Sequence, residues 1–143
     1  MAGRANEPGW WQRYSDVVPS WFETYLGVEQ ASSIIRPYQP QLLPGMLQTE
    51  QVARAVIQTN PGQVTSDDEL ERRVALRLAR QDLLGHSEAP ALWTVVDESA
   101  LWRLNGRSVI RAQIEHLIKM AELPNVIIQL IPIYSGERWL RRR

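Results

Sequence analysis

Apolar residues recur every three to four positions in several stretches of the chain, which is the spacing of one face of an α-helix. This pattern predicts helical segments near residues 10–18, 21–28, 49–58, 65–84 and 107–123. Pro19 separates the first two, so we expect either two short helices or one broken helix there. Leu70, Val74 and Leu78 form the core-facing stripe of the longest helix.

Three other segments are predicted to be strands, near residues 33–38, 91–96 and 126–133. The last is almost continuously apolar, as expected of a strand whose two faces are both covered. The helix between the last two strands has the length of a right-handed βαβ crossover. Its inward face is predicted from Val109, Ile110, Ile114, Leu117 and Ile118, with His116 nearby. We therefore expect an α+β domain in which helices pack on a small mixed sheet.

The segment Pro44–Thr49 is the sharpest corner in the pattern, because it joins an extended segment to a helix. Pro44 fixes φ and Gly45 tolerates unusual backbone conformations, which together favour a tight turn. Thr49 is placed to cap the following helix. Two interpretations stay open: a plain corner, or a site that presents the amide of Gln48 and the hydroxyl of Thr49.

Arg77 lies only about 20° from Leu70 on a helical wheel, because each residue of a helix advances about 100°. A solvated charge is unfavourable there, so its guanidinium either snorkels or meets a carboxylate or a ligand. Asp97 and Glu98 follow a core strand and are the expected partners of Arg77 or Arg80. Pairing with arginine lowers a carboxylate's pKa, which favours structure or anion recognition over proton transfer.

The composition argues against several classes of function. The 143 residues include 16 basic and 16 acidic residues, and a self-sufficient nucleic-acid binder usually has a basic excess. We therefore expect no direct contact with nucleic acid. There is no cysteine, and the two histidines lie in different elements, so no metal site is expected. No phosphate loop or dinucleotide fingerprint occurs, so we expect no cofactor.

No apolar run approaches the roughly 20 residues that span a membrane, and the N-terminus has no apolar signal region. A cytoplasmic protein without membrane contact is expected. Six tryptophans against one phenylalanine suggest aromatic walls or an interface.

Five short motifs resemble, in content and order, those of the Xre-type antitoxin-like transcriptional regulators of actinobacteria. They are Glu29 with Ala31, Pro44–Thr49 with Ala53–Ala55, Arg77–Gln81, Asp97–Leu101, and Gln113 with Leu117 ahead of Pro124–Val126 and Gln129. The likeness runs from about Trp10 to Gly136. It implies a single sensor or interaction domain over residues 10–136, between a lead of residues 1–9 and a basic tail of residues 137–143.

In such regulators a helix-turn-helix precedes this domain, and further strands follow it. Neither is present in this sequence, so we expect an incomplete sheet whose open edge is covered by a partner chain or by the basic tail. The partner expected is a second copy, which would make a homodimer. The resemblance implies a role in transcription control or an antitoxin-like pairing.

Two hypotheses about function follow. The first is a module that binds a small-molecule ligand or a protein partner. Its candidate residues are Trp10, Trp11, Trp21, Tyr25, Gln48, Arg77, Arg80, Gln81, Glu98, Trp102 and Arg103. The second is a small cyclase-like enzyme recruited to a biosynthetic pathway, which folds an apolar substrate by proximity in an aromatic pocket that also includes Trp93. Its candidate catalytic groups are Glu98, Asp97, Tyr25 and His116.

Pro44–Thr49 is the most recognisable of the family motifs. We therefore expect Gln48 to face Arg77, Arg80 and Gln81, together with Glu98, in one buried polar centre. We expect this polar centre to stabilise the fold first, and to serve as a binding site only after that.

Overall fold

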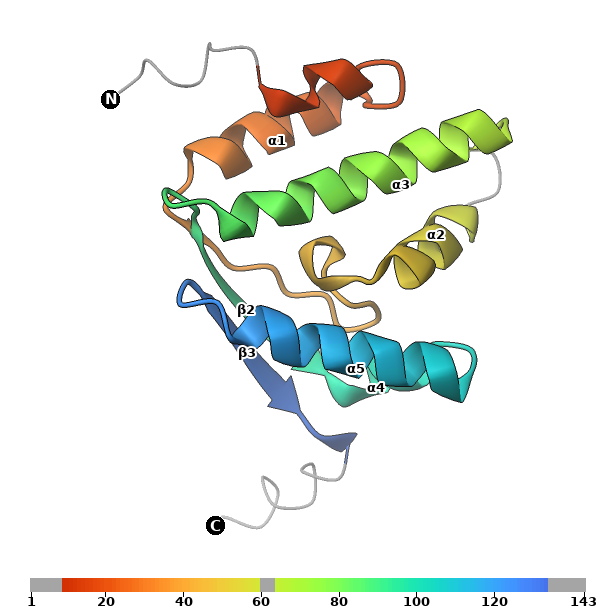
Figure 1. Ribbon diagram of the computed structural model, residues 1–143, viewed down its shortest axis with the longest axis vertical. Helices are drawn as coiled ribbons and strands as arrows, with labels where there is room; N and C mark the ends of the chain where they lie inside the picture. The colour runs from red at the N-terminus through yellow and green to blue at the C-terminus, as the bar shows by residue number, and fades with distance from the viewer. Residues whose placement is uncertain (1–8, 60–63, 134–143) are drawn as a thin grey trace.

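The computed structural model describes residues 9–59 and 64–133 of the chain, which fold into five α-helices and a three-stranded sheet (Figure 1). The helices are α1 (Ser20–Ala31), α2 (Glu50–Gln58), α3 (Asp67–Asp82), α4 (Glu98–Trp102) and α5 (Arg107–Ala121). The strands are β1 (Ile34–Ile35), β2 (Ala91–Asp97) and β3 (Val126–Ile131). The α+β class is confirmed. Apart from Gly9, the predicted lead (residues 1–9) lies outside the described residues, as does the basic tail (137–143).

The sheet has the strand order β1-β2-β3, and both pairings are parallel. The chain passes from β2 to β3 through α4 and α5, as the predicted crossover requires. The expectation of a mixed sheet is wrong for the described residues, in which every paired strand is parallel. β1 is also shorter than predicted, because the chain leaves the ladder before Pro37 and returns only at a bridge from Tyr38 to Val95.

The helices of the described residues cover only one face of this sheet. Along β2, Leu92, Thr94 and Val96 are buried, whereas Trp93 between them is exposed. On β3, the side chain of Ile127 is 53% exposed. The prediction that residues 126–133 are covered on both faces is therefore wrong, since the described helices supply no second layer.

The inward face of α5 also differs from the predicted one. Gln113, Leu117 and Met120 are buried, whereas Ile114 is exposed and the side chain of Ile118 is 60% exposed. The prediction that Ile114 and Ile118 point inward is wrong. The helix presents the face that carries Gln113, because that side chain hydrogen-bonds the backbone of the Pro-Gly corner.

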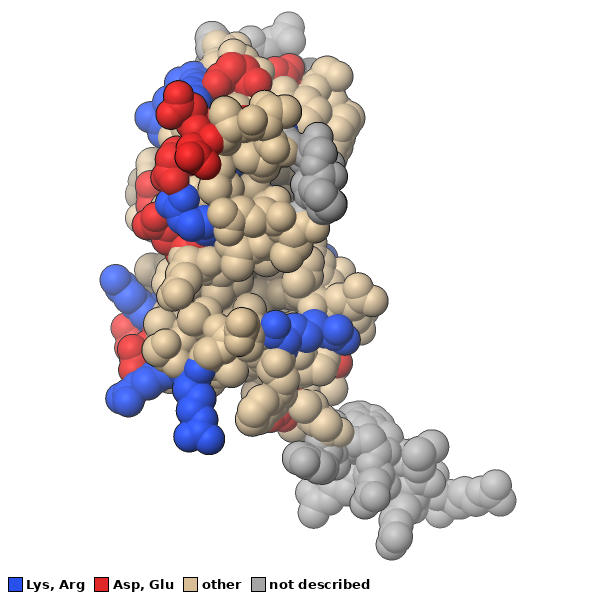
Figure 2. Space-filling model, turned by 90° about the vertical axis from the view of Figure 1, so that its right-hand side faces the viewer, with Lys and Arg blue, Asp and Glu red and all other residues tan. Residues whose placement is uncertain are grey.

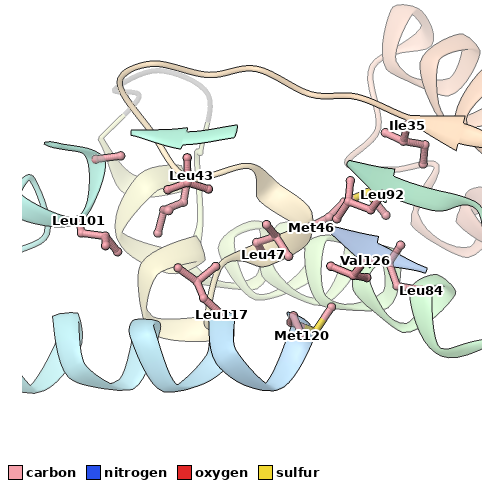
Figure 3. Packing of buried hydrophobic residues seen from close by; sticks show 12 residues of the cluster. Ile35, Leu43, Met46, Leu47, Leu84, Leu92, Leu101, Leu117, Met120 and Val126 are labelled. Atoms are coloured by element: carbon pink, nitrogen blue, oxygen red, sulfur yellow. The ribbon is translucent and has the colours of Figure 1, made fainter. Parts of the chain in front are cut away.

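The Pro-Gly corner (Pro44–Thr49) lies at the centre of the core. Its residues Met46 and Leu47 pack between Leu117 of α5 and Leu92 of β2 (Figure 3). Thr49 caps α2 by accepting a hydrogen bond from the Val52 N–H. No helix in the described part of the chain is both long enough and apolar enough to cross a membrane.

Candidate functional site

The backbone of the Pro-Gly corner is held by glutamine side chains. Gln48 donates from Nε2 to the Leu43 carbonyl at 2.8 Å. From α3, Gln81 donates from Nε2 to the carbonyls of Gly45 (3.1 Å) and Gln48 (2.6 Å). Buried carbonyls without partners destabilise a fold, so these contacts stabilise the short 3-10 turn Gly45–Leu47 and the extended residue Gln48 that follows it.

From the opposite side, Gln113 of α5 binds the same corner with both ends of its amide. Its Nε2 donates to the Leu47 carbonyl at 2.6 Å, and its Oε1 accepts from the Thr49 N–H at 2.8 Å. The Gln113 side chain is fully buried. The corner is therefore clamped between α3 and α5.

Gln48 also connects the corner to Arg77. The Arg77 Nη1 donates to the Gln48 Oε1 at 2.7 Å, and Gln48 itself is 1% exposed. The predicted contacts of Gln48 with Arg77 and Gln81 are confirmed. The predicted contact with Glu98 is wrong, because Glu98 accepts hydrogen bonds from the Trp102 Nε1 and the Ile133 N–H beyond the end of β2.

Arg80 forms a buried ion pair with Glu29 of α1. Its Nε and Nη2 donate to the two carboxylate oxygens at 2.6 and 2.5 Å, a bidentate geometry. Tyr25 joins this pair, since its hydroxyl lies 3.4 Å from Glu29 and 3.2 Å from Arg80. Asp97 and Glu98 were the expected partners, and this prediction is wrong because both lie at the start of α4.

These surroundings act differently on the two arginines. Burial opposes the charge of Arg80, but the hydrogen bonds and charge of Glu29 outweigh it and raise the pKa of Arg80. Burial, and then the nearby charge of Arg80, lower the pKa of Arg77. Among the described residues Arg77 has no carboxylate partner, and it remains protonated because guanidinium is so strongly basic. The pKa of Tyr25 is raised, and burial is the main cause.

A cleft of about 330 Å³ opens between α1 and α2, with α3 as its floor. Arg73, Leu76, Arg77 and Arg80 form this floor at helical spacing, and they place three guanidiniums along it. The walls are apolar and come from the segment before α1, from α1 itself and from α2: Val17, Pro19, Trp21, Phe22, Val56 and Ile57.

The predicted ligand residues divide into separate groups. The cleft is lined by Trp21, Arg77 and Arg80. Three others do not line it: Tyr25 hydrogen-bonds Arg80, Gln48 hydrogen-bonds Arg77, and Gln81 hydrogen-bonds the Gln48 backbone. Trp10 and Trp11 pack against a smaller core cluster of Val18, Leu26 and Leu76. Glu98 lies at the start of α4, where Trp102 is 66% exposed and Arg103 is also exposed. Only Trp21 of the six expected aromatic wall residues therefore faces this cleft.

The four candidate catalytic groups are not brought together. Tyr25 is on α1, Asp97 ends β2, Glu98 begins α4 and His116 lies on α5, and no hydrogen bond joins any two of them in the described structure. Asp97 caps α4 by accepting from the Ser99 N–H, and the pKa of Asp97 is lowered first by the Ser99 side chain and then by this N–H. Burial lowers the pKa of His116. No cluster suited to a metal ion occurs in the described ranges.

The sequence did not reveal the second wall of the cleft. Val56 and Ile57 continue the apolar pattern of α2 and gave no signal that distinguishes them from core residues. For Arg73, the i, i+4 and i+7 spacing with Arg77 and Arg80 was the available signal for a basic floor.

Fold and cleft together define a small α+β domain with an arginine-lined cleft between α1 and α2. The chain belongs to the family described as Domain of unknown function (DUF5753), which matches residues 22–142. Comparisons with curated proteins and with solved structures found no match.

Proposed function

We propose that this domain is the ligand-binding module of an antitoxin-like, Xre-type transcriptional regulator of actinobacteria, working in the cytoplasm and not itself reading DNA. The observation that carries the proposal is the cleft between α1 and α2, where the charge of Arg77 has no carboxylate partner among the described residues. Compact apolar clefts with a few placed polar groups are typical small-molecule sites.

The surface charge is consistent with a module that leaves DNA to another domain. The chain has no basic excess, and the face drawn in Figure 2 carries acidic and basic side chains mixed along one side. DNA binding normally needs a clustered basic surface to neutralise phosphates. The cyclase alternative has less support, because its aromatic walls and its acid and base groups lie on separate elements.

Filling the cleft tests the proposal. Ile57→Trp places an indole in the cleft wall, and it should weaken binding of any cleft ligand by about tenfold or more, roughly 1.4 kcal/mol. Binding is measured by nuclear magnetic resonance with a panel of one-ring aromatic and short aliphatic compounds, charged and neutral. The matched control is Ile118→Trp, on the exposed side of α5. The proposal is contradicted if no compound of the panel binds the protein, or if the compounds bind Ile57→Trp and Ile118→Trp with equal affinity.

We also propose that the partner of this domain is a second copy joined through β3. Strand β3 is an edge of the described sheet, and none of its residues Val126–Ile131 is charged. Uncharged edges readily pair with other chains, and a twofold axis would bring the same edge together with itself.

Ile127→Lys should convert this dimer to a monomer, because it adds one charge per copy to the face that adjoins the shared edge. Size-exclusion chromatography with light scattering measures the change. Ile118→Lys, at a comparably exposed position on α5 (60% exposed, against 53% for Ile127), should remain dimeric. A monomeric unmodified protein would sink the idea.

A further inference from the structure

The charges along the cleft floor leave one positive charge unbalanced. Arg73 pairs with Glu69 at 2.8 Å, and Arg80 pairs with Glu29. Arg77 has only the neutral amide of Gln48 as a hydrogen-bond partner in the described part of the chain. The three guanidiniums of the floor therefore face two carboxylates, and the excess charge lies on Arg77.

Arg77 is also held in place with donors to spare. A guanidinium has five N–H donors in a planar fork, and one contact, from Nη1 to Gln48, fixes this fork. Such a fork suits bidentate binding of a carboxylate.

The rest of the cleft suits an apolar body. Phe22 and Trp21 form one wall, Val56 and Ile57 form the other, and Leu76 interrupts the arginines of the floor. A volume of about 330 Å³ is at the small end of ligand sites. One net charge beside apolar walls favours a monoanion, whereas a nucleotide or another polyphosphate would bring several charges that the cleft does not neutralise.

We infer that the cleft binds a small monocarboxylic acid with an apolar body, its carboxylate on Arg77 and its body between α1 and α2. This inference rests on the proposed function and specifies its ligand class. Binding would supply an anion that no described residue gives Arg77, and it would bridge α1, α2 and α3.

Isothermal titration with octanoate and with octanamide tests the inference, because the two compounds share an apolar body and differ in charge. The unmodified protein should bind octanoate about tenfold more tightly, the usual advantage of a charged over a neutral hydrogen bond. Arg77→Gln should remove that preference, because it should weaken octanoate binding much more than octanamide binding. Arg77→Lys should keep part of it. Arg111→Gln, whose exposed side chain pairs with Glu115 on α5, should behave as the unmodified protein.

Equal affinities for octanoate and octanamide, or a preference that survives in Arg77→Gln, would overturn the inference. The inference would also be overturned if octanoate did not bind while other compounds bound the unmodified protein but not Ile57→Trp. That result would leave the proposed function standing. If no compound of the panel binds the cleft, the proposed function fails first and the inference with it. Urea unfolding of Arg77→Lys and Arg77→Gln establishes that both variants are folded.

Discussion

Glu29→Ala is expected to lower the free energy of unfolding by about 3–5 kcal/mol, the usual cost of removing one partner from a buried ion pair. The Glu29 side chain is 3% exposed and binds Arg80 through both oxygens. Its removal leaves a guanidinium between α1 and α3 without a carboxylate. Urea unfolding followed by tryptophan fluorescence measures the loss.

Two variants separate the charge from other effects of the substitution. Glu29→Gln keeps an acceptor of the same shape and should cost less, roughly 1–3 kcal/mol. Glu115→Ala breaks the exposed pair with Arg111 and should cost no more than about 1 kcal/mol. A Glu29→Ala loss as small as that of Glu115→Ala would mean that the buried pair does not stabilise the packing of α1 on α3.

Much of the fold could be predicted because its signals are local. The stripe of Leu70 and Val74 placed α3, and Ser66 caps it by accepting from the Glu69 N–H. β-Branched and aromatic residues placed β2. The polar centre was predicted in part, since the wheel position of Arg77 indicated an inward guanidinium, and it does contact Gln48.

The errors concern choices that only tertiary structure makes. Arg80 forms its ion pair with Glu29, which is 51 residues away in the sequence, and not with Glu98. Ile118 is as apolar as Leu117, yet α5 buries the face that carries Gln113. A polar residue decides the rotation of α5 here, because two buried backbone groups of the corner have no other partner in the described structure. Apolar periodicity alone could not detect this.

Gln113→Leu is therefore expected to be severely destabilising, even though it places an apolar side chain of similar size in a buried position. The Leu47 carbonyl and the Thr49 N–H would both lose their partner, and each unsatisfied group costs about 1–3 kcal/mol. The total expected loss is roughly 2–6 kcal/mol, a large part of the stability of an ordinary domain.

Chemical unfolding of Gln113→Leu is compared with that of Gln58→Leu, an exposed position on α2 that should change stability by less than about 0.5 kcal/mol. Gln113→Glu should lose less stability than Gln113→Leu. It keeps an acceptor for the Thr49 N–H, but an ionised carboxylate cannot donate to the Leu47 carbonyl. If Gln113→Leu were as stable as the unmodified protein, apolar packing alone would hold the corner. The rotation of α5 would then need a different explanation from the clamp formed by Gln113.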